Sequence, residues 1–133
     1  MRNDGRQAPA LWILIASLSG ITAILAGTLA AHLLAAEPHG AQLMSTGAHY
    51  AMVHALALLA TALLGRGETK AAMLRAAGWL FTAGIILFSG SLYALALTGF
   101  RPVAWLTPFG GLAFLLGWAA LGLQAWRRLR SDA

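Results

Sequence analysis

Four long windows without a charged residue constrain this chain more than any other feature. No Asp, Glu, Lys or Arg occurs in residues 7–36, 38–65, 76–100 or 102–126. An α-helix needs about 20 residues to cross the hydrocarbon core of a bilayer, and each window is longer than that. Of the 133 residues 59% are hydrophobic and 10% charged, and a soluble domain of this size cannot bury so much apolar surface. The sequence predicts one all-α domain over residues 1–133, an integral membrane four-helix bundle.

The residues between these windows are typical of helix breaks and turns. Glu37-Pro38 separates the first helix from the second, and the segment GRGETK, residues 65–70, predicts a polar turn. Thr107 predicts an N-cap for the last helix, with Pro108 at the first helical position, where its missing N–H costs nothing. We therefore expect spans near residues 10–34, 46–65, 76–98 and 108–126.

The basic residues are divided unequally between the two sides of the predicted bundle. With four spans, the N-terminus, the loop at residues 65–75 and the C-terminus share one side. That side carries Arg2, Arg6, Arg66, Lys70, Arg75, Arg127, Arg128 and Arg130, and the other carries only Arg101. Lys and Arg accumulate on the cytoplasmic side of membrane proteins. We expect a multi-pass protein of the inner (plasma) membrane with both termini in the cytoplasm.

Small residues recur along the spans at helical spacing. The first span carries Ala16, Gly20, Ala23, Gly27 and Ala31, the third carries Gly84, Ser91 and Thr98, and the fourth carries Gly110, Ala113 and Gly117. Such residues let helix backbones approach closely, and close packing largely replaces the hydrophobic drive between helices in lipid. The pattern predicts tight helix–helix packing rather than a pore.

The histidines are the most distinctive polar residues. An ionisable side chain inside a span is costly to bury and is a candidate functional residue for that reason. His54 lies within the second span and His32 near the end of the first, and Tyr50 and Thr28 precede them by four residues on the same helix face. We expect His54 to point into the bundle, toward the first span, where it meets His32 or Thr28. His49 is expected to be more exposed.

These side chains allow three interpretations. They form hydrogen-bonded polar seams between helices, or His32, His54, Tyr50 and Thr28 bind a haem, quinone or lipid or handle protons. In the third interpretation His32, His54 and Met52 bind a metal, since imidazole and thioether groups are ligands of copper.

Other kinds of chemistry find little support in the sequence. The chain has no cysteine, which excludes disulfides and thiolate metal sites. The four acidic residues, Asp4, Glu37, Glu68 and Asp132, all lie outside the predicted spans, so neither a Ser-His-Asp set nor an intramembrane carboxylate pair is expected. Basic residues at the ends of spans are not a nucleic-acid footprint. We expect no enzymatic activity and no nucleic-acid partner.

Four motifs resemble those of a known group. The segments AGTLAAHLL, YAMVHALALL, FSGSLYALALTG and TPFGGLAFLLGW, one in each span, are similar to the YgdD/YwdK group of small four-span membrane proteins with a domain of unknown function. The resemblance covers residues 11–122. It implies a four-helix inner-membrane protein and brings no established activity. His32 and His54 match its motifs, whereas the position of His49 more often carries a basic residue such as Arg.

Two functions are consistent with these observations. The first is a membrane protein without a catalytic site that associates with itself or serves as an accessory subunit of a larger membrane complex. Its partners are then the lipid bilayer and other copies or subunits. The alternative is a metal-, haem- or quinone-binding membrane protein that uses His32 and His54.

Overall fold

The computed structural model describes residues 4–66 and 72–131, with side chains from Pro9 onward. The elements in chain order are α1 (Asp4–His32), α2 (Pro38–Leu64), α3 (Ala72–Gly84), η1 (Ile85–Ser89), α4 (Gly90–Thr98), η2 (Arg101–Leu106) and α5 (Thr107–Ser131). The segment η1 is a π-helical turn that joins α3 to α4, and η2 is a 3₁₀-helix that leads into α5. No strand occurs in these described ranges. The predicted all-α fold is confirmed.

Four helical segments are long and apolar enough to cross a membrane. They are Pro9–His32, Pro38–Leu64, Ala72–Thr98 and Arg101–Ser131. The third combines α3, η1 and α4, and the fourth combines η2 and α5. The expected break at Pro38 is present, because α2 begins at this residue. The exact positions of the four bilayer boundaries stay a prediction.

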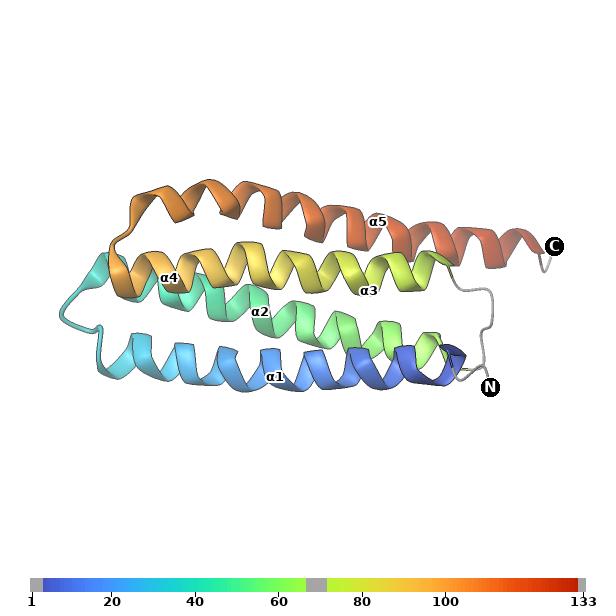
Figure 1. Ribbon diagram of the computed structural model, residues 1–133, viewed down its shortest axis with the longest axis horizontal. Helices are drawn as coiled ribbons and strands as arrows, with labels where there is room; N and C mark the ends of the chain where they lie inside the picture. Colours follow the sequence, from blue (N-terminus) through green and yellow to red (C-terminus); the bar gives the residue numbers. More distant parts are fainter. Residues whose placement is uncertain (1–3, 67–71, 132–133) are drawn as a thin grey trace.

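The four spans lie side by side as an elongated bundle (Figure 1). In this view α1 and α5 are the outer helices, and α2 and the α3–α4 span lie between them. The main packing partners are α1 with α2 and α3 with α5, while α2 also packs against α3, η1 and α4. The turns that join α1 to α2 and α4 to η2 are at one end, and α1 begins and α5 ends at the other.

The interface between α3, η1 and α5 is built from phenylalanines that face glycines. The Phe81 ring lies where a Cβ at Gly117 would come 2.6 Å from it. In the same way a Cβ at Gly84 would clash with the Phe114 ring, and one at Gly110 with the backbone of Phe88. The tight helix packing predicted from small residues is present at these three glycines, and it joins the third span to the fourth.

A seam of mostly small residues joins α1 to α2. The residues that α1 buries follow a spacing of three and four, and they are Trp12, Ala16, Ser19, Ala23, Ala26 and Ala30. The Ser19 hydroxyl donates a hydrogen bond of 3.2 Å to the Ala51 carbonyl on α2. Since most of these side chains are small, the two helices pack closely over their length.

One predicted helix cap is wrong. Thr107 has helical backbone angles, φ −58° and ψ −47°, because η2 continues directly into α5 and leaves no free helix start to cap. Its hydroxyl instead lies 2.7 Å from the Ser91 hydroxyl of α4, where the two side chains form a hydrogen bond. Among the other sequence predictions, the turn at residues 65–70 lies mostly outside the described residues, as do Arg2 and Lys70.

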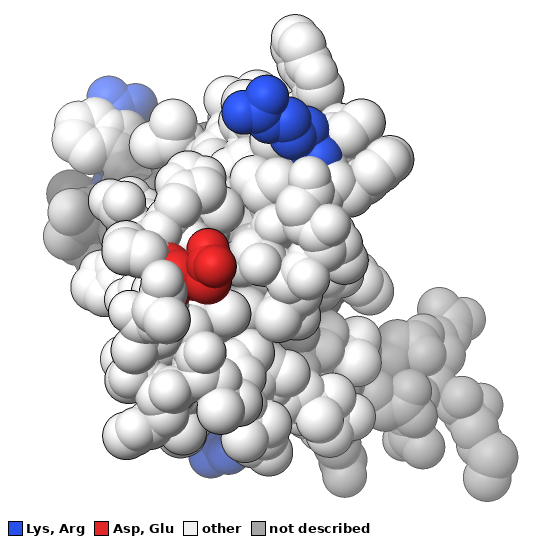
Figure 2. All heavy atoms as spheres, turned by 90° about the vertical axis from the view of Figure 1, so that its left-hand side faces the viewer, with Lys and Arg blue, Asp and Glu red and all other residues white. Residues whose placement is uncertain are grey.

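Charge is concentrated at one end of the bundle. Figure 2 looks onto the opposite end, which carries the α1–α2 and α4–η2 turns, and almost all of the visible surface is uncharged. Glu37 and Arg101 lie in these turns and are both exposed. At the other end the described basic side chains are Arg66, Arg75, Arg127, Arg128 and Arg130.

Candidate functional site

His54 is the most buried of the histidines in the described part of the chain. Only 4% of its surface is exposed, whereas His32, His39 and His49 are all exposed. Its Nδ1 lies 2.8 Å from the Tyr50 carbonyl one turn earlier on α2. A carbonyl can only accept, so Nδ1 carries the hydrogen in this arrangement and donates it.

The second ring nitrogen of His54 reaches another helix. The indole Nε1–H of Trp118 on α5 donates a hydrogen bond of 3.2 Å to His54 Nε2. Nε2 is available as an acceptor because the hydrogen is on Nδ1. Both nitrogens of the buried imidazole are therefore hydrogen-bonded. The pair links α2 to α5, two helices with little other close backbone contact.

Aromatic rings surround this histidine. The His54 ring stacks on Phe114, with centroids 3.5 Å apart and planes 9° apart, and Phe81 lies at 5.6 Å. A cavity of about 380 Å³ borders the group, and Tyr50 and Trp118 are among its lining residues. Tyr50 and Trp118 are 41% and 49% exposed, so the cluster opens toward the lipid-facing surface between α2 and α5.

The expected direction of the His54 side chain is partly wrong. His54 does point into the bundle, and His49 is more exposed, as predicted. However, its ring faces α5 and α3 rather than α1, because Trp118 and Phe114 provide its donor and its stacking surface. Thr28 does not reach it, since the Thr28 hydroxyl donates to the Ile24 carbonyl on its own helix at 3.0 Å.

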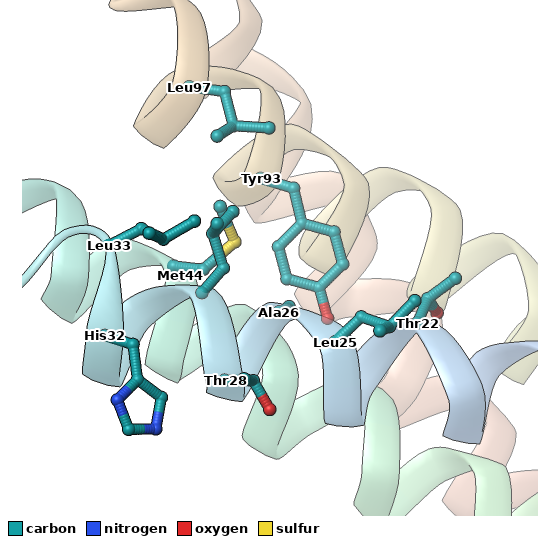
Figure 3. Close-up of a pocket in the computed structure, with 10 residues that line it drawn as sticks. Thr22, Leu25, Ala26, Thr28, His32, Leu33, Met44, Tyr93 and Leu97 are labelled. Carbon is teal, nitrogen blue, oxygen red and sulfur yellow. The ribbon is translucent and has the colours of Figure 1, made fainter.

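His32 and Thr28 belong to a different part of the molecule. Both line a groove of about 460 Å³ between α1 and α4, with Met44 of α2 and Tyr93 of α4 also in its walls. Figure 3 shows the His32 ring extending away from the Tyr93 ring, at the margin of the groove. The four predicted cofactor-binding residues are therefore divided between two cavities, His32 and Thr28 in one and His54 and Tyr50 in the other.

Tyr93 is the polar residue of this groove that sequence reasoning missed. Its ring packs where a Cβ at Gly47 would lie 2.7 Å away, and its hydroxyl is buried without a hydrogen-bond partner among the described residues. The Ser89 hydroxyl, one turn earlier at the end of η1, is in the same state. An unpaired buried hydroxyl costs about 1–3 kcal/mol. The sequence signal that could have identified Tyr93 is the pairing of aromatic residues with glycines on neighbouring helices, here Tyr93 with Gly47.

The residues proposed as metal ligands do not come together. His32 and His54 line separate cavities, and Met52 lines neither of them. Within residues 4–66 and 72–131 there is no group of three or more His, Cys, Asp or Glu side chains that could hold a metal ion. A metal at His54 Nε2 would also have to displace the Trp118 hydrogen bond. The geometry at His54 suits a structural contact between helices better than a ligand site.

Comparison with known proteins identifies the family of this chain. Residues 26–111 match the model of a family described as protein of unknown function, DUF423. The chain belongs to the DUF423 family. This region begins in the second half of α1 and ends in the first turns of α5, so it contains His32, His54 and Tyr93 but not Phe114 or Trp118.

Individual DUF423 relatives cover almost the whole chain. A UPF0382 membrane protein of Haemophilus influenzae is 39% identical over 87% of this chain and 94% of its own length. The UPF0382 membrane protein YwdK of Bacillus subtilis is 35% identical over 90% and 98%, and the UPF0382 inner membrane protein YgdD of Escherichia coli is 34% identical over 89% and 91%. The resemblance to the YgdD/YwdK group is confirmed. No solved structure matches this chain.

Proposed function

We propose that this DUF423 membrane protein resides in the inner (plasma) membrane and acts there without catalysis, through helix packing with other copies of itself or with the subunits of a larger complex. The observation that supports this function is an outward-facing seam on α1. It follows the same spacing of three and four as the buried seam of α1 and is formed by Ser17, Gly20, Ile24, Gly27 and Ala31.

Within the described part of the chain, no neighbouring helix packs against the two glycines of this second seam. A Cβ added at Gly20 or Gly27 would have no atom within 4 Å, and Ile24 between them is 62% exposed. The contrast with Gly47, Gly78 and Gly117 is informative, because at each of these a neighbouring aromatic ring occupies the space beside the glycine. Small residues in lipid favour the close approach of another helix. The seam therefore fits a helix from outside this chain.

The alternative function, a metal-, haem- or quinone-binding site on His32 and His54, has less support. The two histidines line separate cavities, and both ring nitrogens of His54 are engaged by Tyr50 and Trp118. A ligand that used both histidines would require α1 and α2 to move relative to each other. Metal analysis and an absorption spectrum of the natively purified protein separate the two functions.

The test of the packing function changes the seam and leaves the monomer intact. Gly20→Leu and Gly27→Leu place side chains where the chain itself has open space, so the fold is expected to persist. We expect native mass spectrometry from nanodiscs to give an oligomer or a co-purified complex for the wild-type protein. The Gly20→Leu and Gly27→Leu variants should give mainly monomer.

The matched control is Gly122→Leu on α5. Gly122 is exposed and also has no atom within 4 Å of an added Cβ, but it lies on a different helix. This variant should associate like the wild type. A wild-type protein that is only monomeric and captures no partner refutes the proposal, and so does equal disruption by Gly122→Leu.

A further inference from the structure

A third cavity lies at the basic end of the bundle, apart from both histidine sites. It measures about 300 Å³ and lies between the end of α2, the start of α3 and the last turns of α5. Leu64, Leu74, Leu121 and Leu129 supply apolar walls from these three helices. Leu74 is buried at 3% exposure, whereas Leu64 and Leu129 are 48% and 71% exposed. The cavity is therefore an apolar slot that extends from the interior to the lipid-facing surface.

Polar groups line the same cavity. Gln124 and Arg128, one turn apart on α5, both lie in its wall and are half-buried. One guanidinium nitrogen of Arg128 donates to the Leu64 carbonyl at 3.5 Å, the long limit of a hydrogen bond. This contact places the Arg128 guanidinium beside the end of α2, at the cavity. A guanidinium carries five N–H donors in a planar fork that matches the oxygens of a phosphate.

The neighbouring arginines of α5 point elsewhere. Arg130 lies over the Trp126 ring at 5.2 Å from its centroid, and Arg127 is exposed and does not line the cavity. Arg66 and Arg75 add positive charge at this end of the bundle. The sequence assigns eight of the nine Lys and Arg residues to this end of the bundle, together with three of the four acidic residues, Asp4, Glu68 and Asp132. The net charge of this end is therefore positive, and it complements an anionic ligand.

We propose that this cavity binds one anionic phospholipid from the leaflet at the basic end of the bundle. An acyl chain lies along the leucines, and the phosphate accepts hydrogen bonds from Arg128 and Gln124. The ligand class follows from charge complementarity combined with the apolar slot, since basic pockets between membrane helices bind acidic lipid headgroups. The cavity lies where the second and fourth predicted spans end and the third begins, so a lipid of that leaflet reaches it from the side.

The first experiment compares two adjacent arginines. Wild-type protein in mild detergent is titrated with phosphatidylglycerol and, separately, with phosphatidylcholine, and bound lipid is counted by native mass spectrometry. We expect phosphatidylglycerol alone to remain bound. Arg128→Gln should weaken its binding about tenfold or more, because a hydrogen-bonded charge is lost. Arg127→Gln removes the same charge one residue away and should weaken it less than about threefold, as expected for an exposed and screened charge.

A second variant tests the slot without any change in charge. Ala125 lines the cavity and is exposed, so Ala125→Phe fills the slot without disturbing the core. It should reduce phosphatidylglycerol binding as strongly as Arg128→Gln does, and it keeps the test valid if Arg128→Gln fails to fold. Ala119→Phe, at an exposed position of α5 away from the cavity, is the control and should bind normally.

Three outcomes would overturn the proposal. Equal losses for Arg127→Gln and Arg128→Gln would mean a general attraction of lipid to a basic surface. Undiminished binding to Ala125→Phe would mean that the apolar slot holds no acyl chain. Displacement of the lipid by millimolar inorganic phosphate would mean a phosphate site rather than a lipid site.

Discussion

At the scale of single residues, His54 illustrates how an ionisable group is kept inside an apolar bundle. The side chain is almost fully buried, yet each ring nitrogen has a partner, the Tyr50 carbonyl on one side and the Trp118 indole on the other. A buried polar group without partners would cost several kcal/mol by hydrocarbon-transfer measures, and pairing removes most of that cost. The stacked Phe114 ring adds contact over one face of the imidazole.

We expect His54→Leu to destabilise the protein more than His49→Leu. The first change removes the Trp118 hydrogen bond and the stacking on Phe114, at a cost of about 1–3 kcal/mol. The second changes an exposed side chain and should stay within about 0.5 kcal/mol. Thermal unfolding in detergent micelles measures both.

A double-mutant cycle with Trp118→Phe isolates the hydrogen bond in this prediction. Trp118→Phe removes the indole donor and keeps an aromatic ring. If the effects of His54→Leu and Trp118→Phe simply add, the two side chains are not coupled, and the structural role given to the pair is wrong.

At the scale of elements, the third and fourth spans interlock through phenylalanines set against glycines. Phe81 faces Gly117 and Phe114 faces Gly84, so each helix supplies both a ring and a space for a ring. This reciprocity fixes the axial position of α5 against α3, because a shift by one residue would bring a ring against a residue with a Cβ.

We expect Gly117→Ala to destabilise the protein although the added methyl group is small. Its Cβ would come 2.6 Å from the Phe81 ring, which overpacks the interface at a cost of about 1–3 kcal/mol. Gly122→Ala on the same helix has open space and should be neutral, or stabilising by up to about 1 kcal/mol. Urea or thermal unfolding in detergent compares the two. A stable Gly117→Ala with an unchanged midpoint would show that the interface is looser than described.

The sequence predicts these elements better than it predicts their mutual rotation. Helices follow from the uncharged windows, since in lipid every backbone N–H and C=O must be paired within the segment. The burial of His54 follows from the cost of exposing it to lipid. Which neighbour it meets depends on how α2 is rotated against α5, and one sequence carries no direct record of that rotation. Phe114 and Trp118, four residues apart, form an aromatic face on α5, but their spacing does not specify the helix that packs against it.

The short irregular helices were also beyond prediction from the sequence. The π-helical turn η1 lies in a segment, IILFS, whose composition does not differ from regular apolar helix. The 3₁₀-helix η2 contains Arg101 and Pro102, which indicate a break between spans but do not specify a 3₁₀-helix. The η1 turn lies where the third span contacts both α2 and α5. The Thr107 cap is wrong because the segment that precedes it is helical.

At the scale of the whole molecule, the bundle is electrically asymmetric along its long axis. The described arginines other than Arg101 gather where α2 and α5 end and α3 begins, while the opposite end is nearly uncharged (Figure 2). This asymmetry supports our expectation that the basic end is cytoplasmic, since Lys and Arg are retained on that side of the membrane.

Labelling of single cysteines tests this orientation, and the chain has no cysteine of its own to interfere. Arg66→Cys at the basic end should resist a membrane-impermeant thiol reagent in intact cells, and His39→Cys at the other end should react. Both positions are exposed, so accessibility to water does not limit the reaction. After permeabilisation both should react equally. If only Arg66→Cys reacts in intact cells, the basic end faces outward and the predicted orientation is wrong.

The π-helical turn η1 also determines where the third span can lose a residue and keep its packing. A π-turn accommodates one residue more than an α-turn. Loss of a single residue from Ile85–Ser89 would leave a regular α-helix, with Phe81 still directed at α5 and Tyr93 still directed at α2. The same loss within α2 would rotate all later side chains by about 100° and carry His54 away from Trp118. A one-residue deletion is therefore expected to be tolerated at η1 and not in α2.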